Sequence, residues 1–550
     1  MTFRLLRALA FAVLLLAGPS ARAAEPLLLG GDERILVLAP HPDDETLFAG
    51  GLVQEALALD VPVRVCFLTM GDNNEISFLF TRKHPVIFPG AVRAMGTLRM
   101  HEAIAASTQL GLATNDLVFL GYPDAGTLAI WNGHWREVPP YRSKLTRVNA
   151  VPYERALTPG SAYAGEDILD DLDEVLRDFR PTHVVVPHPA DHNVDHRALY
   201  LFARVALWNL AAEFPAPELL PAPLHFTQWP EPRRYHPLRS ASPPHFLADA
   251  VAWREFALAP FQVSNKLAAI RRHHTQYRWS APYLDSFIRK SELFGDFPDI
   301  VLPPAGAAVD LPEEDASQFR PDETLFDELA ERSAGLEAIA DQIRSESRAL
   351  GDDDNDFVAR GIRADDTHLT LVLSFQFRKR LLRDVVLSVA LHGYRFGVPF
   401  GEMPKIAIET TADRIRSIRD LQTDLPPDAV ELLPGSHENE VVLRVPLALL
   451  GDPEKILTSA QLSSGQLPID WVAWRVVDLV PGAAAPPPAR PAPFADESAS
   501  KPAPEPEPEA APAPAEEPPP PQKANALTPR VPLPRTSIPA HTEASEPVFW

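Results

Sequence analysis

The stretch ILVLAPHPDDETLFAGG at residues 35–51 decides the fold class of this chain. A short apolar run ends immediately before His41, Asp43, Asp44 and Glu45. Aspartate and glutamate are favoured where a helix begins, so a turn followed by a helix start is one interpretation. A turn needs only one or two polar residues, however. An imidazole and three carboxylates within five residues therefore suggest a functional site at the end of a buried strand.

Apolar runs typical of strands alternate with helix-like stretches in the first 214 residues. The expected strands cover 34–39, 62–70, 116–122 and 182–189, and the expected helices cover 45–59, 93–112, 165–179 and 195–214. This alternation predicts an α/β fold, a Rossmann-like parallel sheet with helices on both faces, over residues 30–300. Open sheets of this kind bind ligands at the carboxyl ends of their strands.

A second polar cluster, PHPADHNVDH at residues 187–196, follows the fourth expected strand. The ends of the first and fourth strands can be neighbours in such a sheet, so His41, Asp44 and His196 can meet there. Two imidazoles and one carboxylate with open positions suit catalytic Zn²⁺ and also Fe²⁺. Asp43 would then be free to accept a proton from water activated by the metal.

The rest of the chain divides by composition. Residues 123–164 form a long, aromatic-rich interruption, which favours a lid or binding rim. Residues 318–480 suggest a helical linker over 318–350 and then a smaller β-sandwich-like domain, because apolar and polar positions alternate in several runs. Residues 481–550 are rich in Pro, Ala and Glu and are expected to be disordered. The period-two runs cover 368–377, 385–396, 405–410, 440–447 and 469–480.

The N-terminus and the overall charge bear on location and partners. Residues 1–24 carry two arginines, a short apolar stretch and a small-residue cleavage site, which predict a signal peptide and a periplasmic or secreted protein. An uncleaved anchor is the alternative; no stable transmembrane span is expected after cleavage. The net charge of −23 argues against nucleic acid as a partner. The lone Cys66 is expected to be a buried strand residue. The oligomeric state is not predicted.

The two polar motifs resemble those of the PIG-L/LmbE family of zinc-dependent N-acetylglucosaminyl deacetylases. APHPDDE matches the first family motif fully, and VDHRALY matches the second, whose usual form is H-P-D-H. Weaker similarities, such as GYPDAG, extend the resemblance over residues 34–296. The resemblance implies zinc binding by the three residues named above, with Asp43 as general base. It also implies that Asp195 orients a neighbouring imidazole or metal ligand.

Other site residues follow from the same resemblance or from residue type. Arg99 occupies the position of the family's substrate-binding arginine, with a helix-surface charge as the alternative. Asp124 would touch substrate or be a turn residue. Trp131 and Trp135, with Tyr141, could stack on sugar rings or simply pack within their loop.

The chain departs from the family pattern at one position. Three residues before the last zinc ligand, where the family usually has a histidine that stabilises the oxyanion, this chain has Asn193. Asparagine can donate a hydrogen bond but supplies no proton. His192, one residue earlier, is the alternative acid, with a solvated side chain as the other interpretation.

The expected activity is removal of an N-acetyl group from a GlcNAc-containing glycan or glycoconjugate. A zinc amidase for another N-acyl substrate, such as an acylated antibiotic or lipid, is equally compatible with the motifs, because they encode amide chemistry and not the sugar. A glycan-binding protein without turnover is the third possibility.

Overall fold

The structure is a computed structural model that describes residues 24–73, 88–226, 228–303, 309–310, 357–375, 385–436, 440–464 and 467–479. These residues belong to one compact unit that ends at Ala484. The signal peptide, the helical linker over 318–350 and the disordered tail predicted from the sequence concern residues 1–23, 318–350 and 481–550, which lie outside the described residues.

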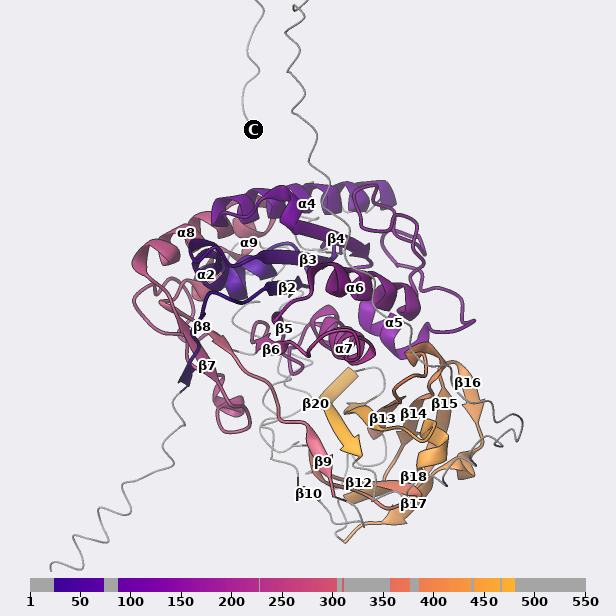
Figure 1. Ribbon diagram of the computed structural model, residues 1–550. Coiled ribbons are helices and arrows are strands. Elements are labelled where there is room, and N and C mark those ends of the chain that lie inside the picture. Colours follow the sequence, from indigo (N-terminus) through magenta and orange to yellow (C-terminus); the bar gives the residue numbers. More distant parts are fainter. Residues whose placement is uncertain are drawn as a thin grey trace, which may run out of the picture. The chain divides into compact units, whose positions relative to one another are not determined.

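A five-stranded parallel sheet organises the N-terminal part (Figure 1). Its strands lie in the order β4-β3-β2-β5-β6, and every neighbouring pair is parallel. Their bounds are β2 Ile35–Ala39, β3 Val63–Thr69, β4 Leu117–Tyr122, β5 His183–Pro187 and β6 Glu218–Ala222. The four predicted strands are therefore present and form an α/β sheet. The fifth, β6, was not predicted; it contains Pro221, which an edge strand tolerates.

Helices cover this sheet. Their bounds are α2 Asp44–Ala58, α4 Pro89–Leu110, α5 Thr127–Gly133, α6 Gly165–Phe179, α7 Val194–Asn209, α8 Pro260–Ile270 and α9 His274–Leu284. Helices α2, α4 and α8 pack together, and α5, α6 and α7 form a second group. A small sheet, β1-β7-β8, adds β1 Glu25–Pro26, β7 Arg254–Ala257 and β8 Ser291–Phe294.

The strand order creates a crevice at one point of the sheet. The chain leaves β2 towards β3 on one side and later returns to β5 on the other side of β2. The loops that follow β2 and β5 therefore run in opposite directions and leave room between them. Both polar clusters of the sequence lie in these two loops.

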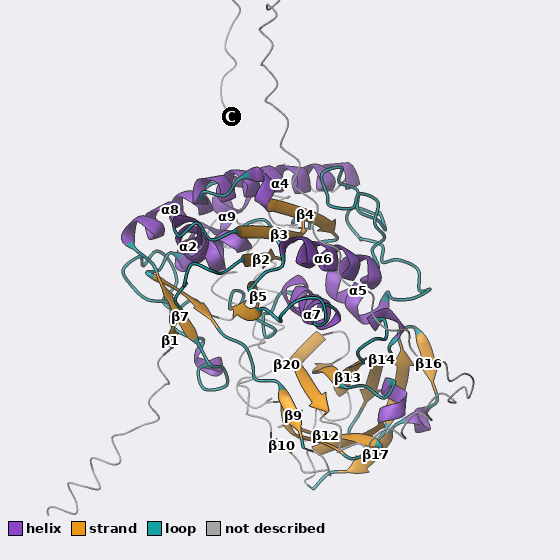
Figure 2. Ribbon diagram, viewed as in Figure 1, coloured by secondary structure: helices purple, strands orange, loops and turns teal. Residues whose placement is uncertain are grey.

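The C-terminal part is mostly strands, as the period-two runs predict (Figure 2). They form a five-stranded sheet, β10-β11-β12-β18-β17, and a seven-stranded sheet, β16-β15-β14-β13-β19-β20-β9, whose buried residues share one core. The bounds are β9 Ile300–Leu302, β10 Val309–Asp310, β11 Phe357–Ala364, β12 His368–Phe375, β13 Val385–Tyr394, β14 Lys405–Thr410, β15 Ile415–Asp420, β16 Thr423–Leu425, β17 Glu431–Pro434, β18 Glu440–Pro446, β19 Lys455–Ser464 and β20 Leu467–Leu479.

Within the described ranges, no helix is both long enough and apolar enough to cross a membrane.

Candidate active site

The three residues expected to bind metal come together at the crevice. His41 follows β2, Asp44 begins α2, and His196 lies in the first turn of α7, after β5. Asp44 Oδ2 lies 3.1 Å from His41 Nδ1 and 3.2 Å from His196 Nε2, and the two ring nitrogens are 3.3 Å apart. All three side chains are buried.

This donor set fits a zinc ion. The three ligand atoms all lie within 4.8 Å of one another and comprise two nitrogens and one oxygen. Ligands that hold zinc tetrahedrally, with bonds of about 2.0–2.1 Å, are roughly 3.3 Å apart, which is close to the separations found here. Two neutral imidazoles and one carboxylate are also the usual protein donors of a catalytic zinc site.

Charge inside the triad favours a cation. Burial lowers the pKa of His196, but Asp191 and Asp44 outweigh burial and raise it to about 9. Burial alone would raise the pKa of Asp44; the His196 imidazole instead holds it well below its usual range. The protein without metal therefore favours a positive charge among these side chains, and a bound metal ion would replace the protons.

Each imidazole has a carboxylate on its other nitrogen. Asp195 Oδ2 lies 3.1 Å from His41 Nε2, and Asp191 Oδ2 lies 3.1 Å from His196 Nδ1. Such partners fix the ring orientation and tautomer of metal ligands. Asp195 is itself held by hydrogen bonds from the backbone of Ala125 and from both the backbone and the hydroxyl of Thr127. Asp195 therefore lies beside an imidazole, as the sequence predicts, whereas Asp191, five residues before His196, was not predicted.

Asp43 adopts a strained backbone conformation directly before α2. Its φ of 128° is rare for a residue with a side chain and costs on the order of 1–3 kcal/mol. Its side chain is 13% exposed, whereas that of Asp44 is 2% exposed. Burial raises the pKa of Asp43 to about 6, against the opposing effect of Arg99. A partly accessible carboxylate thus stands next to a metal ligand, which suits a general base.

Arg99 holds the loop that carries Asp43. The side chain is buried, so it is not a helix-surface charge. Its Nη1 donates to Gly71 O at 2.8 Å, and its Nη2 donates to Pro42 O at 2.7 Å and lies 3.3 Å from Asp43 Oδ1. These contacts hold the loop around Asp43, and the substrate-binding role expected of Arg99 stays a prediction.

Asp124 lies at the site rather than in a remote turn. Its Oδ1 is 3.4 Å from His41 Nε2, and its Oδ2 accepts a hydrogen bond from Asn73 N at 2.9 Å. Burial would raise the pKa of Asp124, but His41 lowers it to about 2. His41, Asp124 and Asp195 form a second grouping of possible ligands among the described residues. Asp195 already accepts hydrogen bonds from Ala125 and Thr127. We therefore infer that Asp124 and Asp195 orient the His41 imidazole and do not bind a second metal ion.

Asn193 and His192, the two residues considered for the acid role, both have contacts within the protein. Asn193 is the N-cap of α7, and its Oδ1 accepts a hydrogen bond from Asp195 N at 2.8 Å. The ring of His192 lies edge-on to Phe226. A further imidazole, that of His225, lies beside His196, with ring centroids 4.7 Å apart. It lies in the loop after β6, a strand that the sequence did not reveal.

His225 is held by a tyrosine. Its Nδ1 lies 2.8 Å from the hydroxyl of Tyr283 in α9. Burial lowers the pKa of His225 to about 4, so its ring is neutral at pH 7. Neither residue stands in a recognisable motif, and their pairing joins segments 58 residues apart.

Trp131 and Trp135 do not face the crevice, which corrects their expected role in sugar stacking. Both are fully buried. Trp131 packs edge-on against Phe202 and stacks on Phe400, and Trp135 contacts the same two phenylalanines. Tyr141 remains half-buried, so it is the aromatic residue of this segment that can still contact a ligand.

Comparison with known proteins gives consistent similarities. Residues 36–207 match the PIG-L family model, described as GlcNAc-PI de-N-acetylase. A 1D-myo-inositol 2-acetamido-2-deoxy-alpha-D-glucopyranoside deacetylase 1 of Saccharopolyspora erythraea is 31% identical over 180 residues, which cover 31% of this chain and 51% of the relative. A deacetylase with the same substrate in its name, from Mycobacterium sp. (strain KMS), is 30% identical over 193 residues, 34% of this chain and 54% of the relative.

The chain therefore spans about half the length of the curated relatives it matches. Among solved structures, the N,N'-diacetylchitobiose deacetylase from Pyrococcus horikoshii is 16% identical, and the match covers 46% of this chain and 75% of that one. Its TM-score is 0.29.

Proposed function

We propose that this protein is a zinc-dependent N-deacetylase that acts on a GlcNAc-containing glycan or glycoconjugate; the match of residues 36–207 to the PIG-L family model supports this. The convergence of His41, Asp44 and His196, with Asp43 beside them, is the observation that carries the proposal. The two curated relatives are named for an inositol-linked 2-acetamido sugar, which supports this substrate class.

The chemistry can be assigned to the residues of the chain. His41, Asp44 and His196 would hold the zinc ion, which would supply the Lewis acidity needed to polarise an amide carbonyl and to lower the pKa of water. Asp43 accepts the proton of the attacking water. The water oxygen bonds to the acetyl carbon, the carbon–nitrogen bond breaks, and the nitrogen takes up the proton that Asp43 accepted from water. The products are acetate and a free amino sugar.

We assign to His225 the role of stabilising the oxyanion, for which the family usually has a histidine where this chain has Asn193. When its Nδ1 accepts a hydrogen bond from Tyr283, the ring proton is on Nε2, and this N–H can donate to the carbonyl oxygen of the substrate. Replacing His225 with glutamine keeps a donor of similar reach, whereas alanine removes it. We expect the alanine variant to lose much more activity than the glutamine variant, with metal content unchanged.

Acetate release by the full chain tests the function. The purified protein is loaded with zinc and supplied with GlcNAc-inositol, chitooligosaccharides and N-acylated lipids or antibiotics in parallel. Preferential release from the GlcNAc conjugates supports the proposal. If only the N-acylated lipids or antibiotics were hydrolysed, the protein would be a zinc amidase for another N-acyl substrate and not a GlcNAc deacetylase. Binding of glycan without turnover, in a zinc-loaded sample, would favour the non-catalytic alternative.

We also propose that the protein is exported, on the basis of the N-terminal sequence alone. Expression in a Gram-negative host, followed by fractionation and N-terminal sequencing of the product, tests this. A mature chain that starts near residue 24 in the periplasm is the expected result, and an intact N-terminus in the cytoplasm would contradict it.

A further inference from the structure

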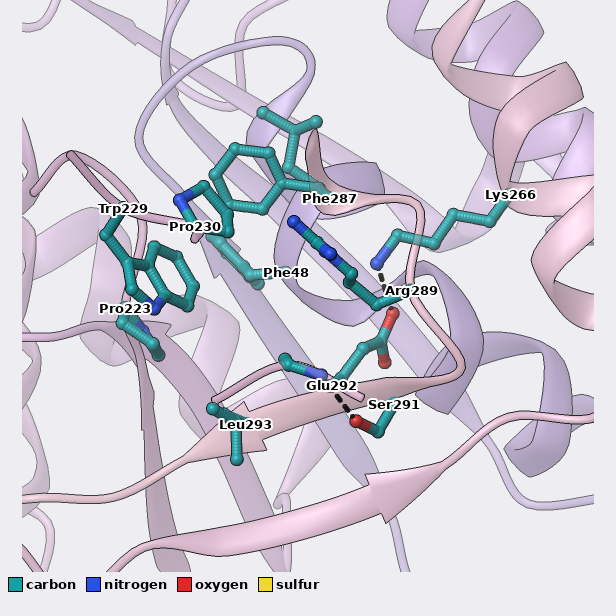
Figure 3. Close-up of a pocket in the computed structure, with 12 residues that line it drawn as sticks. Phe48, Pro223, Trp229, Pro230, Lys266, Phe287, Arg289, Ser291, Glu292 and Leu293 are labelled. Carbon is teal, nitrogen blue, oxygen red and sulfur yellow. Dashed lines mark hydrogen bonds and ion pairs between the residues drawn. The ribbon is translucent and has the colours of Figure 1, made fainter. Parts of the chain in front are cut away.

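A small cavity lies away from the metal triad, between α2, the loop after β6 and the segment that leads into β8. The space open to the centre of a water-sized sphere is about 20 Å³. Its walls are mostly apolar and include Phe48, Trp229, Phe287 and Leu293 (Figure 3). Two cationic side chains, Lys266 and Arg289, also line it.

Arg289 is a buried cation whose hydrogen bonds are incomplete. The residue is 2% exposed. Its Nε donates to Ser286 O at 2.8 Å, and Nη2 donates to Pro232 O. Nη1 is buried and has no hydrogen-bond partner among the described residues. Figure 3 shows the guanidinium reaching between Phe287 and Phe48.

No carboxylate neutralises Arg289 in the part of the chain that the structure describes. Burial lowers the pKa of Arg289, and the nearby Arg239 lowers it further. The guanidinium therefore keeps its charge in an apolar setting where the other charge acting on it is also positive. A buried charge of this kind is costly unless a counter-charge is present.

Glu292, the carboxylate that lines the cavity, already has partners of its own. Glu292 Oε1 lies 2.7 Å from Lys266 Nζ, and the two carboxylate oxygens accept hydrogen bonds from Gly51 N and Leu52 N of α2. Glu292 thus balances Lys266 and ties β8 to α2. One of the two cations that line the cavity is paired, and the other is not.

We propose that this cavity binds a single monatomic anion, chloride under physiological conditions, with Arg289 Nη1 as its hydrogen-bond donor. The size suits a small occupant: the space open to the centre of a water-sized sphere, about 20 Å³, leaves room for one halide ion beside Arg289. The ion neutralises Arg289 and stabilises the packing of β8 on α2, the helix that begins at Asp44.

A halide titration of the full chain tests the proposal. The protein is purified in sodium gluconate, and its thermal unfolding is followed while bromide or chloride replaces gluconate at constant ionic strength. We expect a saturable increase in Tm of about 2 °C or more. The increase should be absent in Arg289→Gln and retained in Arg239→Gln, which removes an exposed cation near the same place. A non-saturating increase, or one that persists in Arg289→Gln, would overturn the proposal.

Crystals of the wild-type protein give a second measurement that does not depend on the folding of the variant. After a bromide soak, an anomalous peak in contact with Arg289 Nη1 is expected. A water molecule in the cavity with no bromide signal would refute an anion site.

Discussion

At the scale of single residues, adjacent side chains of the HPDDE stretch have different tasks because the backbone turns sharply between them. Asp44 lies in the first turn of α2 and faces the two imidazoles, whereas Asp43, with its positive φ, is turned towards Arg99. The strain at Asp43 is offset by the hydrogen bonds of Arg99 and by Glu45, which accepts from Asp43 N at 2.9 Å. Local strain thus keeps the proposed base, Asp43, apart from the proposed metal ligand Asp44, although both are aspartates.

Asp43→Asn should separate metal binding from catalysis. The amide keeps the size of the side chain but accepts no proton at neutral pH, so we expect kcat to fall by roughly 10²–10⁴-fold. Zinc content should stay close to that of the wild type, because Asp43 is not among the three ligand atoms. Metal analysis and acetate release measured on the same preparation check both points. An active variant would remove Asp43 from the role of base.

Trp131→Ala should act on stability and not on substrate binding. The side chain is fully buried against Phe202 and Phe400, so its removal leaves a cavity and should cost about 3–5 kcal/mol of unfolding free energy. Denaturant unfolding and KM at a temperature where the variant is folded are the measurements. Tyr141→Ala serves as the contrasting variant, since the half-buried Tyr141 can contact a ligand. A large change of KM in Trp131→Ala alone would restore the sugar-stacking role.

At the scale of elements, the candidate site lies at strand ends and in loops. A strand of the C-terminal part, in contrast, carries a buried lysine. Lys405 begins β14 and is 1% exposed. Its Nζ donates to Phe400 O at 2.6 Å and to Met403 O at 3.0 Å, and it lies over the rings of Phe400 and Trp135. The pKa of Lys405 responds to the charges of Arg136, Glu166 and Asp420. Lys405 in turn contributes to the lowered pKa of His392.

The unfolding free energy should depend on pH through Lys405. Burial lowers its pKa to about 7, whereas the unfolded chain keeps the proton up to about pH 10.4. Between these values the unfolded state binds more protons, so stability rises with pH, by at most about 1.4 kcal/mol per pH unit. Below pH 7 both states are protonated and the contribution is constant. Urea unfolding at pH 7, 8, 9 and 10 measures this slope.

Lys405→Met should remove that part of the slope. The difference in unfolding free energy between wild type and Lys405→Met should shift in favour of the wild type as pH rises from 7 to 10. Lys455→Met, which removes a partly exposed lysine paired with Asp478, serves as the comparison variant over the same range. If the two variants showed the same pH dependence of the unfolding free energy, the slope could not be assigned to Lys405.

At the scale of the whole molecule, the sheet of the N-terminal part and the strands of the C-terminal part share buried side chains. Tyr394, Phe400 and Trp474 belong to the same core cluster as Trp131 and the strands β2 to β5. Arg197, the residue after the metal ligand His196, lies 4.4 Å from the ring centroid of Trp471. The β-rich part therefore completes the packing around α5 and α7 and is not only an appendage.

A chain that ends at residue 303 should be poorly soluble and should unfold at a lower temperature than the full chain. The truncation would expose Trp131, Trp135 and Phe202, and apolar patches of that kind promote association. A chain that ends at 480 keeps every described residue and should match the full protein. Thermal unfolding and binding of a hydrophobic dye compare the three. Equal behaviour of the 303-residue chain would show that the N-terminal part folds alone.

The sequence by itself determined the elements whose signal is local. Strand-forming runs followed directly by polar clusters located the sheet, its carboxyl edge and the pairing of the HPDDE stretch with the loop before α7. These features could be predicted because a strand that is buried on both faces must be apolar along its length. A polar cluster at the end of such a strand has few structural uses. Short edge strands such as β6 have no such signal, and with β6 the loop of His225 was missed.

Only the tertiary structure decided which side chains face the crevice. Trp131 and Arg99 have residue types that suit a sugar site, but segments far along the chain bury the first in aromatic contacts and engage the second in backbone carbonyls. Asp191 and His225 became site residues because β5 and β6 lie side by side. Burial and pairing depend on contacts between distant segments, and residue type and spacing do not encode those contacts.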